Sequence, residues 1–150
     1  MGSYRHVLIA TDFSELGELA IRRGCELARA QGAAITLVHV LPELTSPSPF
    51  FAHYELKPEP GRRERAAAEA LDALRKHLPP GFEGASREVL FGDPADEILA
   101  LAGRLPADLI VLATHGRRGF ERWRLGSVSE RVVRAPSADV LIVRPPPESE

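Results

Sequence analysis

A glycine and serine pattern near the carboxyl end of the sequence could do chemistry. Gly116 is separated by nine residues from Gly126, and Ser127 and Ser129 follow. Glycine lets a ligand approach the main chain closely, and the first amides of a helix have no partner within that helix. A helix beginning here would offer an anion site suited to phosphate. An ordinary capped helix after a glycine-containing loop fits the spacing equally well.

An acidic residue, Asp12, closely follows another apolar run, "HVLIA" at residues 6–10. If this run and the apolar run "ADLIVL" before Gly116 form neighbouring parallel strands, Asp12 and Gly116 flank one crevice at their carboxyl ends. A carboxylate there could bind a ligand. Alternatively, Asp12 could cap the turn into the following helix.

Motifs for catalysis are missing from the sequence. It contains neither the phosphate-binding loop with its lysine nor the glycine-flanked serine of hydrolases. Its five histidines are scattered without metal-ligand spacing. His115 could touch a phosphate or stabilise a turn, and we interpret the single cysteine, Cys25, as packing. No side chain is therefore assigned a catalytic role.

The elements that must position these residues follow from apolar runs and helix-end signals. The predicted fold is α/β: one doubly wound, Rossmann-like domain over residues 1–150, with helices on both faces of a five-stranded parallel sheet in the order 3-2-1-4-5. Ser127 and Glu130 are expected to form a capping box. An irregular loop is expected at about 42–60, because that segment holds five of the 13 prolines. Strands are expected at 6–10, 33–40, 86–92, 107–114 and 138–145, and helices after Ser14, around 67–78, after Asp93 and at 127–134.

Composition narrows the class of protein. The 150 residues carry a net charge of −2, which does not favour nucleic acid or an anionic membrane as partner. No stretch approaches the roughly 18 apolar residues of a membrane span, and the amino end lacks the apolar region of a secretion signal. Arginines between 117 and 134 surround Trp123; we interpret them as a solvated flank, with one or two steadying polyphosphate. We expect a soluble cytoplasmic protein.

Three segments together resemble the universal stress protein family over nearly the whole chain: "VLIATDFSE", "LVHVLPE" and "LIVLATHGRRG…LGSVSERVVR…VLIVRP". Nucleotide-binding members share a glycine, two residues, a second glycine, nine residues, and then glycine followed by serine or threonine. This sequence matches at Gly116, Gly126 and Ser127. It departs at the first position, where Ala113 replaces glycine.

The resemblance implies an ATP site with Mg²⁺ carried on the phosphates. Asp12 would bind the ribose hydroxyls, and the backbone of Val40 would meet the adenine edge. The resemblance gives the remaining contacts to the ends of two strands and to the glycine segment. They are Ala10; Leu112 and Ala113; and, at the phosphates, Gly116, Gly126, Ser127, Val128 and Ser129. Thr11, beside Asp12, and His115, which could touch a phosphate, complete the expected set.

The resemblance further implies a nucleotide-responsive homodimer in the stress response. Little or no ATP hydrolysis is expected, because the sequence shows neither a general base nor a phosphoryl-transfer lysine. The dimer would pair the last strand, at about 138–144, with its copy, since that strand lies at a sheet edge and its residues 140–143 carry no protective charge. One alternative is a slow ATPase or adenylyl-transferring enzyme of the same architecture. Another, suggested by Ala113, is an interaction dimer without nucleotide.

Overall fold

The structure is a computed structural model that describes residues 3–43, 60–114, 125–135 and 137–147. Strands and helices alternate along these residues, as the apolar runs predicted. The elements are β1 (His6–Ala10), α1 (Glu15–Gln31), β2 (Ala34–Leu41), α2 (Arg62–His77), β3 (Ser86–Phe91), α3 (Pro94–Arg104), β4 (Leu109–Ala113), α4 (Ser127–Arg134) and β5 (Asp139–Val143).

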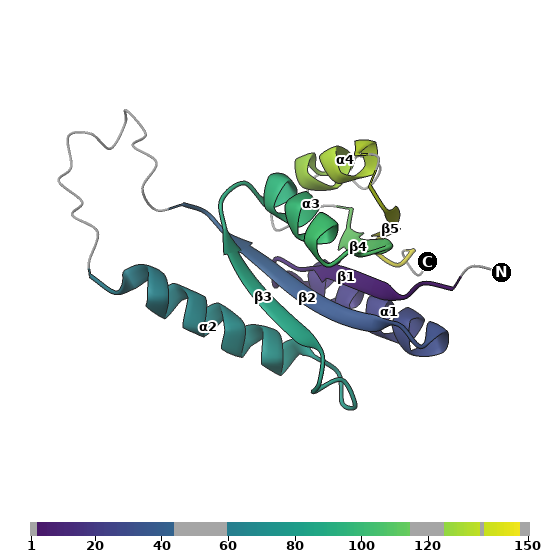
Figure 1. Ribbon diagram of the computed structural model, residues 1–150, viewed down its shortest axis with the longest axis horizontal. Coiled ribbons are helices and arrows are strands. Elements are labelled where there is room, and N and C mark those ends of the chain that lie inside the picture. Colours follow the sequence, from purple (N-terminus) through teal and green to yellow (C-terminus); the bar gives the residue numbers. More distant parts are fainter. Residues whose placement is uncertain (1–2, 44–59, 115–124, 136, 148–150) are drawn as a thin grey trace.

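The five strands form one parallel sheet in the order β3-β2-β1-β4-β5, which confirms the predicted fold class (Figure 1). β1 lies at the centre, paired with β2 on one side and with β4 on the other. Strand order therefore reverses between β1 and β4. β3 and β5 form the two edges, as expected for the last strand.

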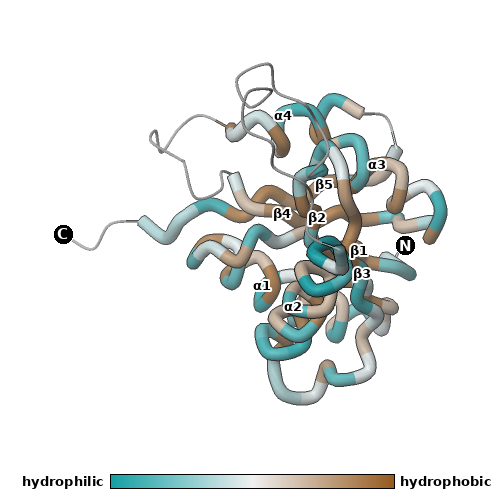
Figure 2. Tube along the Cα trace, turned by 90° about the vertical axis from the view of Figure 1, so that its left-hand side faces the viewer, coloured by the Kyte–Doolittle hydropathy of each residue, from teal (hydrophilic) through white to brown (hydrophobic). Residues whose placement is uncertain are grey.

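Helices cover both faces of the sheet, and each face has its own apolar core. Val7 and Ile9 of β1 pack with α1 and α2 on one face. Leu8 and Ala10 pack with α3 and α4 on the other. Because successive side chains of a strand point to opposite faces, a strand buried on both sides must be apolar throughout. Figure 2 accordingly shows the hydrophobic residues concentrated along the central strands.

Helix ends follow the predicted signals in α1 and α3. The Ser14 side chain accepts a hydrogen bond from the Gly17 amide, and Gly32 ends α1 with φ 67°. Asp93 caps α3 through the Asp96 amide, with proline in the first turn. Left-handed backbone at Gly32 explains why glycine stands there.

One local prediction is wrong. Ser127 does not cap α4: the capping residue is Gly126, with no side-chain hydrogen bond, and Glu130 instead pairs with Arg134. Of the irregular loop expected at 42–60, residues 44–59 lie outside the described part of the chain. Among the helices that the structure describes, none is both long and apolar enough to cross a membrane.

Candidate functional site

The carboxyl ends of β1 and β4 lie side by side at the point where strand order reverses. From β1 the chain passes through α1 to β2, and from β4 it passes through α4 to β5, on opposite faces of the sheet. In open α/β sheets, such a point forms the crevice in which ligands bind. Ala10 and Leu112, near these strand ends, are buried, and half-buried Ala113 ends β4.

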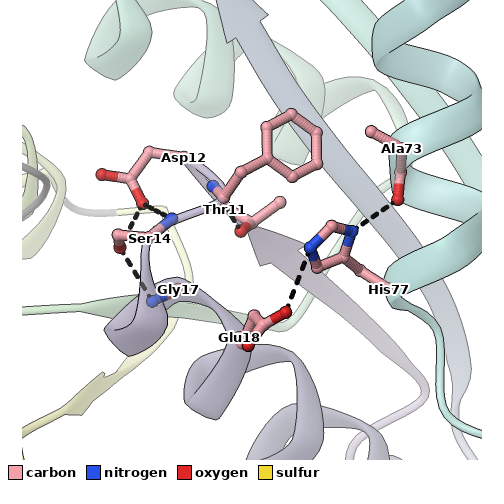
Figure 3. Close-up of polar contacts among 8 residues, drawn as sticks. Thr11, Asp12, Ser14, Gly17, Glu18, Ala73 and His77 are labelled. Atoms are coloured by element: carbon pink, nitrogen blue, oxygen red, sulfur yellow. Dashed lines mark hydrogen bonds and ion pairs between the residues drawn. The ribbon is translucent and has the colours of Figure 1, made fainter.

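Asp12 lies in the tight turn that joins β1 to α1 (Figure 3). Its Oδ1 accepts hydrogen bonds from the Ser14 amide at 3.0 Å and from the Ser14 hydroxyl at 2.5 Å. This geometry is that of an Asx turn, so Asp12 does organise the entry to the helix. A carboxylate can accept about four hydrogen bonds, and the turn is therefore compatible with ligand binding at the same side chain.

The neighbouring residue, Phe13, adopts φ 65°, which is rare for a bulky side chain. Its ring lies 4.4 Å from that of His39 and 5.3 Å from that of His77, measured between ring centroids. His39 Nδ1 in turn donates to the Thr11 carbonyl at 2.8 Å, and the Thr11 hydroxyl accepts from the Phe13 amide at 3.1 Å. Side chains from β2 and α2 thus fix the turn that carries Asp12.

The start of α4 is tied directly to the end of β4. The Gly126 amide donates to the Thr114 carbonyl at 2.5 Å. The hydroxyl of buried Ser129 lies 2.8 Å from the same carbonyl and 3.0 Å from that of Gly126. This places the amino end of α4, with its partial positive charge, at the carboxyl edge of the sheet.

Gly126 has φ −66° and ψ 163°, a conformation open to every residue. The backbone therefore does not require glycine here, but glycine is a favoured helix N-cap and lets another group approach the main chain closely. Ser127 is exposed and Val128 is half-buried. The Ser129 hydroxyl already forms hydrogen bonds with main-chain carbonyls. Only the backbone amide of Ser129 can therefore bind an anion.

Val40 directs its backbone toward the same crevice. The Val38 carbonyl accepts from the Thr11 amide on the β1 side, and the Leu41 carbonyl accepts from the Gly92 amide on the β3 side. Backbone groups of alternate residues in a strand point the same way, so those of Val40 face the β1 side. They lie beyond Val38, the last residue of β2 paired with β1.

Ion pairs account for the described arginines of α4. Arg131 binds Asp93 at 2.6 Å and also Asp96, and these carboxylates, Asp96 foremost, raise the pKa of the guanidinium. The Asp96 amide, helped by Arg131, lowers the pKa of the Asp93 carboxyl. Arg134 pairs with Glu130. The ion pairs of Arg131 connect α4 to α3. These ion pairs direct neither Arg131 nor Arg134 toward a phosphate.

Of the predicted site residues that the structure describes, most lie at the carboxyl ends of β1 and β4 or at the start of α4, and Val40 lies near the end of β2. His115 and Gly116 lie outside the described residues. Within the described ranges, no cluster of three or more histidine, cysteine or carboxylate side chains could hold a metal ion. Sequence reasoning missed the contributions of Phe13, His39 and Ser14 to the turn. The Asp-x-Ser spacing is a local signal for the Ser14 contact, whereas the ring contacts join distant segments.

Fold and site together define an open α/β protein with an anion-compatible helix end at the switch point of the sheet. A family model described as the universal stress protein family matches residues 3–144. The universal stress protein MJ0531 of Methanocaldococcus jannaschii is 35% identical over 146 residues, covering 95% of this chain and 84% of that protein. The chain therefore belongs to the universal stress protein family, as its motifs indicated.

Solved structures agree with this assignment. The hypothetical protein MJ0577 matches with a TM-score of 0.74 and 26% identity, over 98% of this chain and all of that one. A universal stress protein solved in complex with cAMP matches with a TM-score of 0.63 and 26% identity, over 95% of this chain and 98% of that one. Both share the fold along essentially their whole length.

Proposed function

We propose that this universal stress protein binds ATP in the crevice between the carboxyl ends of β1 and β4. The observation that carries the proposal is the hydrogen bond from the Gly126 amide to the Thr114 carbonyl, at 2.5 Å, which ties the amino end of α4 to the end of β4, the strand next to β1. The start of α4 then offers amides for phosphate, and the Asp12 turn after β1 offers a carboxylate for sugar hydroxyls. The family relative in complex with cAMP supports an adenine nucleotide as the ligand.

Each part of the nucleotide has a partner in this proposal. Asp12 accepts hydrogen bonds from the ribose hydroxyls, and the backbone of Val40 meets the adenine edge. Amides at the start of α4 bind the phosphates, and Mg²⁺ is carried on those phosphates. The full set of proposed contacts is Ala10, Thr11, Asp12, Val40, Leu112, Ala113, His115, Gly116, Gly126, Ser127, Val128 and Ser129. The methyl group of Ala113 is expected to narrow the sugar side of the site.

We further propose that the protein acts as a cytoplasmic, nucleotide-responsive homodimer through β5. This strand pairs only with β4 among the strands that the structure describes. Leu141 of β5 is 36% exposed, and Val133 of the neighbouring α4 is 45% exposed. An apolar edge of this kind needs a cover, and antiparallel pairing with the same strand of a second copy supplies one.

Slow or absent hydrolysis follows from the chemistry of the proposed contacts. Backbone amides bind phosphate but cannot take a proton from water, and Asp12 is assigned to the sugar. We therefore expect turnover far below the roughly 1–10³ s⁻¹ of typical enzymes. The nucleotide would act as a signal rather than as a substrate.

The test is to denature freshly purified protein and identify any released nucleotide, and then to titrate nucleotide-free protein with ATP. Release of an adenine nucleotide, saturable binding of ATP and negligible phosphate production are expected. Steady hydrolysis at 1 s⁻¹ or faster, on the order of ordinary enzyme turnover, would assign the protein to the enzyme class. If no binding is detected at millimolar ATP, the result would favour the alternative function, an interaction dimer that binds no nucleotide.

A further inference from the structure

We propose that Ser14 is a positioning residue for the ribose-binding carboxylate of Asp12, an inference that rests on the proposed function. Ser14 makes two contacts with one oxygen of that side chain. Its amide lies 3.0 Å and its hydroxyl 2.5 Å from Asp12 Oδ1. Both groups of Ser14 thus bind the same oxygen of the carboxylate, as Figure 3 shows.

The Ser14 hydroxyl is itself fixed by the first turn of α1. It accepts a hydrogen bond from the Gly17 amide at 3.0 Å. An amide only donates and an ionised carboxylate only accepts, so the chain runs in one direction, from the Gly17 amide through the hydroxyl to Asp12. The hydroxyl proton must point at the carboxylate, which makes the contact directional. The orientation of Asp12 is therefore set by the end of a helix.

Gly17 provides a second, independent observation. Glycine is unfavourable inside a helix relative to alanine, and Gly17 is buried in the first turn of α1. A Cβ at this position would lie 2.8 Å from Thr11 Oγ1, 2.9 Å from Asp12 Oδ1 and 3.3 Å from Ser14 Oγ. A side chain here would displace the carboxylate. The helix thus has glycine, a poor helix former, at the position where a side chain would clash with Asp12.

Fixing the carboxylate gives the site its preference for sugar hydroxyls. A site built to hydrogen-bond a hydroxyl rejects an analogue that lacks it, because its polar group is then left unpaired. A carboxylate free to rotate toward water would lose little when the hydroxyls are missing. Ser14 is accordingly expected to control discrimination between ribose and dideoxyribose rather than general affinity for phosphate.

The experiment titrates the full chain with ATP and with 2′,3′-dideoxy-ATP, for wild type, Ser14→Gly and Ser14→Thr. Glycine is an acceptable helix N-cap, so Ser14→Gly removes the hydroxyl while α1 keeps its start. We expect wild type to prefer ATP by about tenfold or more, the order of one or two hydrogen bonds to a charged group. In Ser14→Gly this preference should fall at least fivefold, with affinity for dideoxy-ATP unchanged. Ser14→Thr, which keeps the hydroxyl, should match wild type.

The outcomes separate the inference from the proposed function. Full preference for ATP in Ser14→Gly would overturn the role of Ser14 alone, and so would an equal loss for both nucleotides. No preference in wild type would overturn the ribose role of Asp12 and the inference with it. Should Ser14→Gly fail to fold, Gly17→Ala takes its place, since it keeps the Ser14 hydroxyl while its Cβ displaces the side chains of Thr11 and Asp12. It must show the same fall in preference, and an unchanged preference would refute the inference.

Discussion

Replacing Gly126 with valine should remove most of the ATP affinity while the fold is retained. Gly126 has φ −66° and ψ 163°, where valine is unstrained, and its backbone hydrogen bond to Thr114 survives the change. The branched side chain would instead occupy the space through which phosphate reaches the α4 amides. Losing two amide–phosphate hydrogen bonds at about 1.5 kcal/mol each costs about 3 kcal/mol. That loss corresponds to a roughly 100-fold weaker Kd.

Isothermal titration calorimetry measures this change, and thermal unfolding without ligand verifies the fold. Gly103→Val is the matched control, because a Cβ at Gly103 meets no atom within 4 Å and α3 ends away from the site. The control should bind ATP as wild type does. A folded Gly126→Val protein with a Kd within twofold of wild type would refute phosphate binding at the start of α4.

Four further predictions concern the turn, the sheet and the dimer. Asp12→Ala should weaken ATP binding by about 1–3 kcal/mol in calorimetry; a lower Tm with unchanged affinity would support the purely structural turn instead. Because Phe13 has φ 65°, Phe13→Gly should be more stable than Phe13→Ala by about 1 kcal/mol in urea unfolding, and the reverse order would contradict strain at this residue. The amides of His6 and Arg5 hold the pKa of the Asp108 carboxyl below its usual 3.8. Its stabilising contribution is therefore present above about pH 4 and is lost as pH falls through the lower folded-state pKa. Asp108→Asn should cost about 1 kcal/mol at neutral pH and flatten the acid limb of unfolding, and an unchanged limb would refute this. Leu141→Lys should convert the dimer to monomer in light scattering, and a wild-type monomer at high micromolar concentration would rule out pairing through β5.

Much of the fold could be predicted from local sequence signals. Continuous apolar runs such as "HVLIA" and "ADLIVL" belong to strands buried on both faces, and Ser14 and Asp93 cap helices as their residue types predict. The order of the strands is less local. It was predicted from the doubly wound architecture as a whole, and the observed pairing of β1 with both β2 and β4 confirms it.

The remaining features depend on contacts between distant segments. The capping box at Ser127 and Glu130 is absent because the Gly126 amide is anchored to Thr114, which places the cap one residue earlier. The left-handed backbone of Phe13 has no signal in its own residue type. Its ring is held by His39 and His77 from other elements, so the local preference against that conformation is overcome by packing.

The most direct test of ATP binding at the switch point is a titration of ¹⁵N-labelled protein with ATP, followed through its backbone amide resonances. Saturable shifts are expected to be largest for Asp12, Val40 and Gly126 with the residues that follow it, at the carboxyl edge of the sheet. Resonances at the opposite edge, such as those of Tyr4 and Asp108, should stay in place. Shifts that are absent at saturating ATP, or that gather at that opposite edge, would contradict the proposed site.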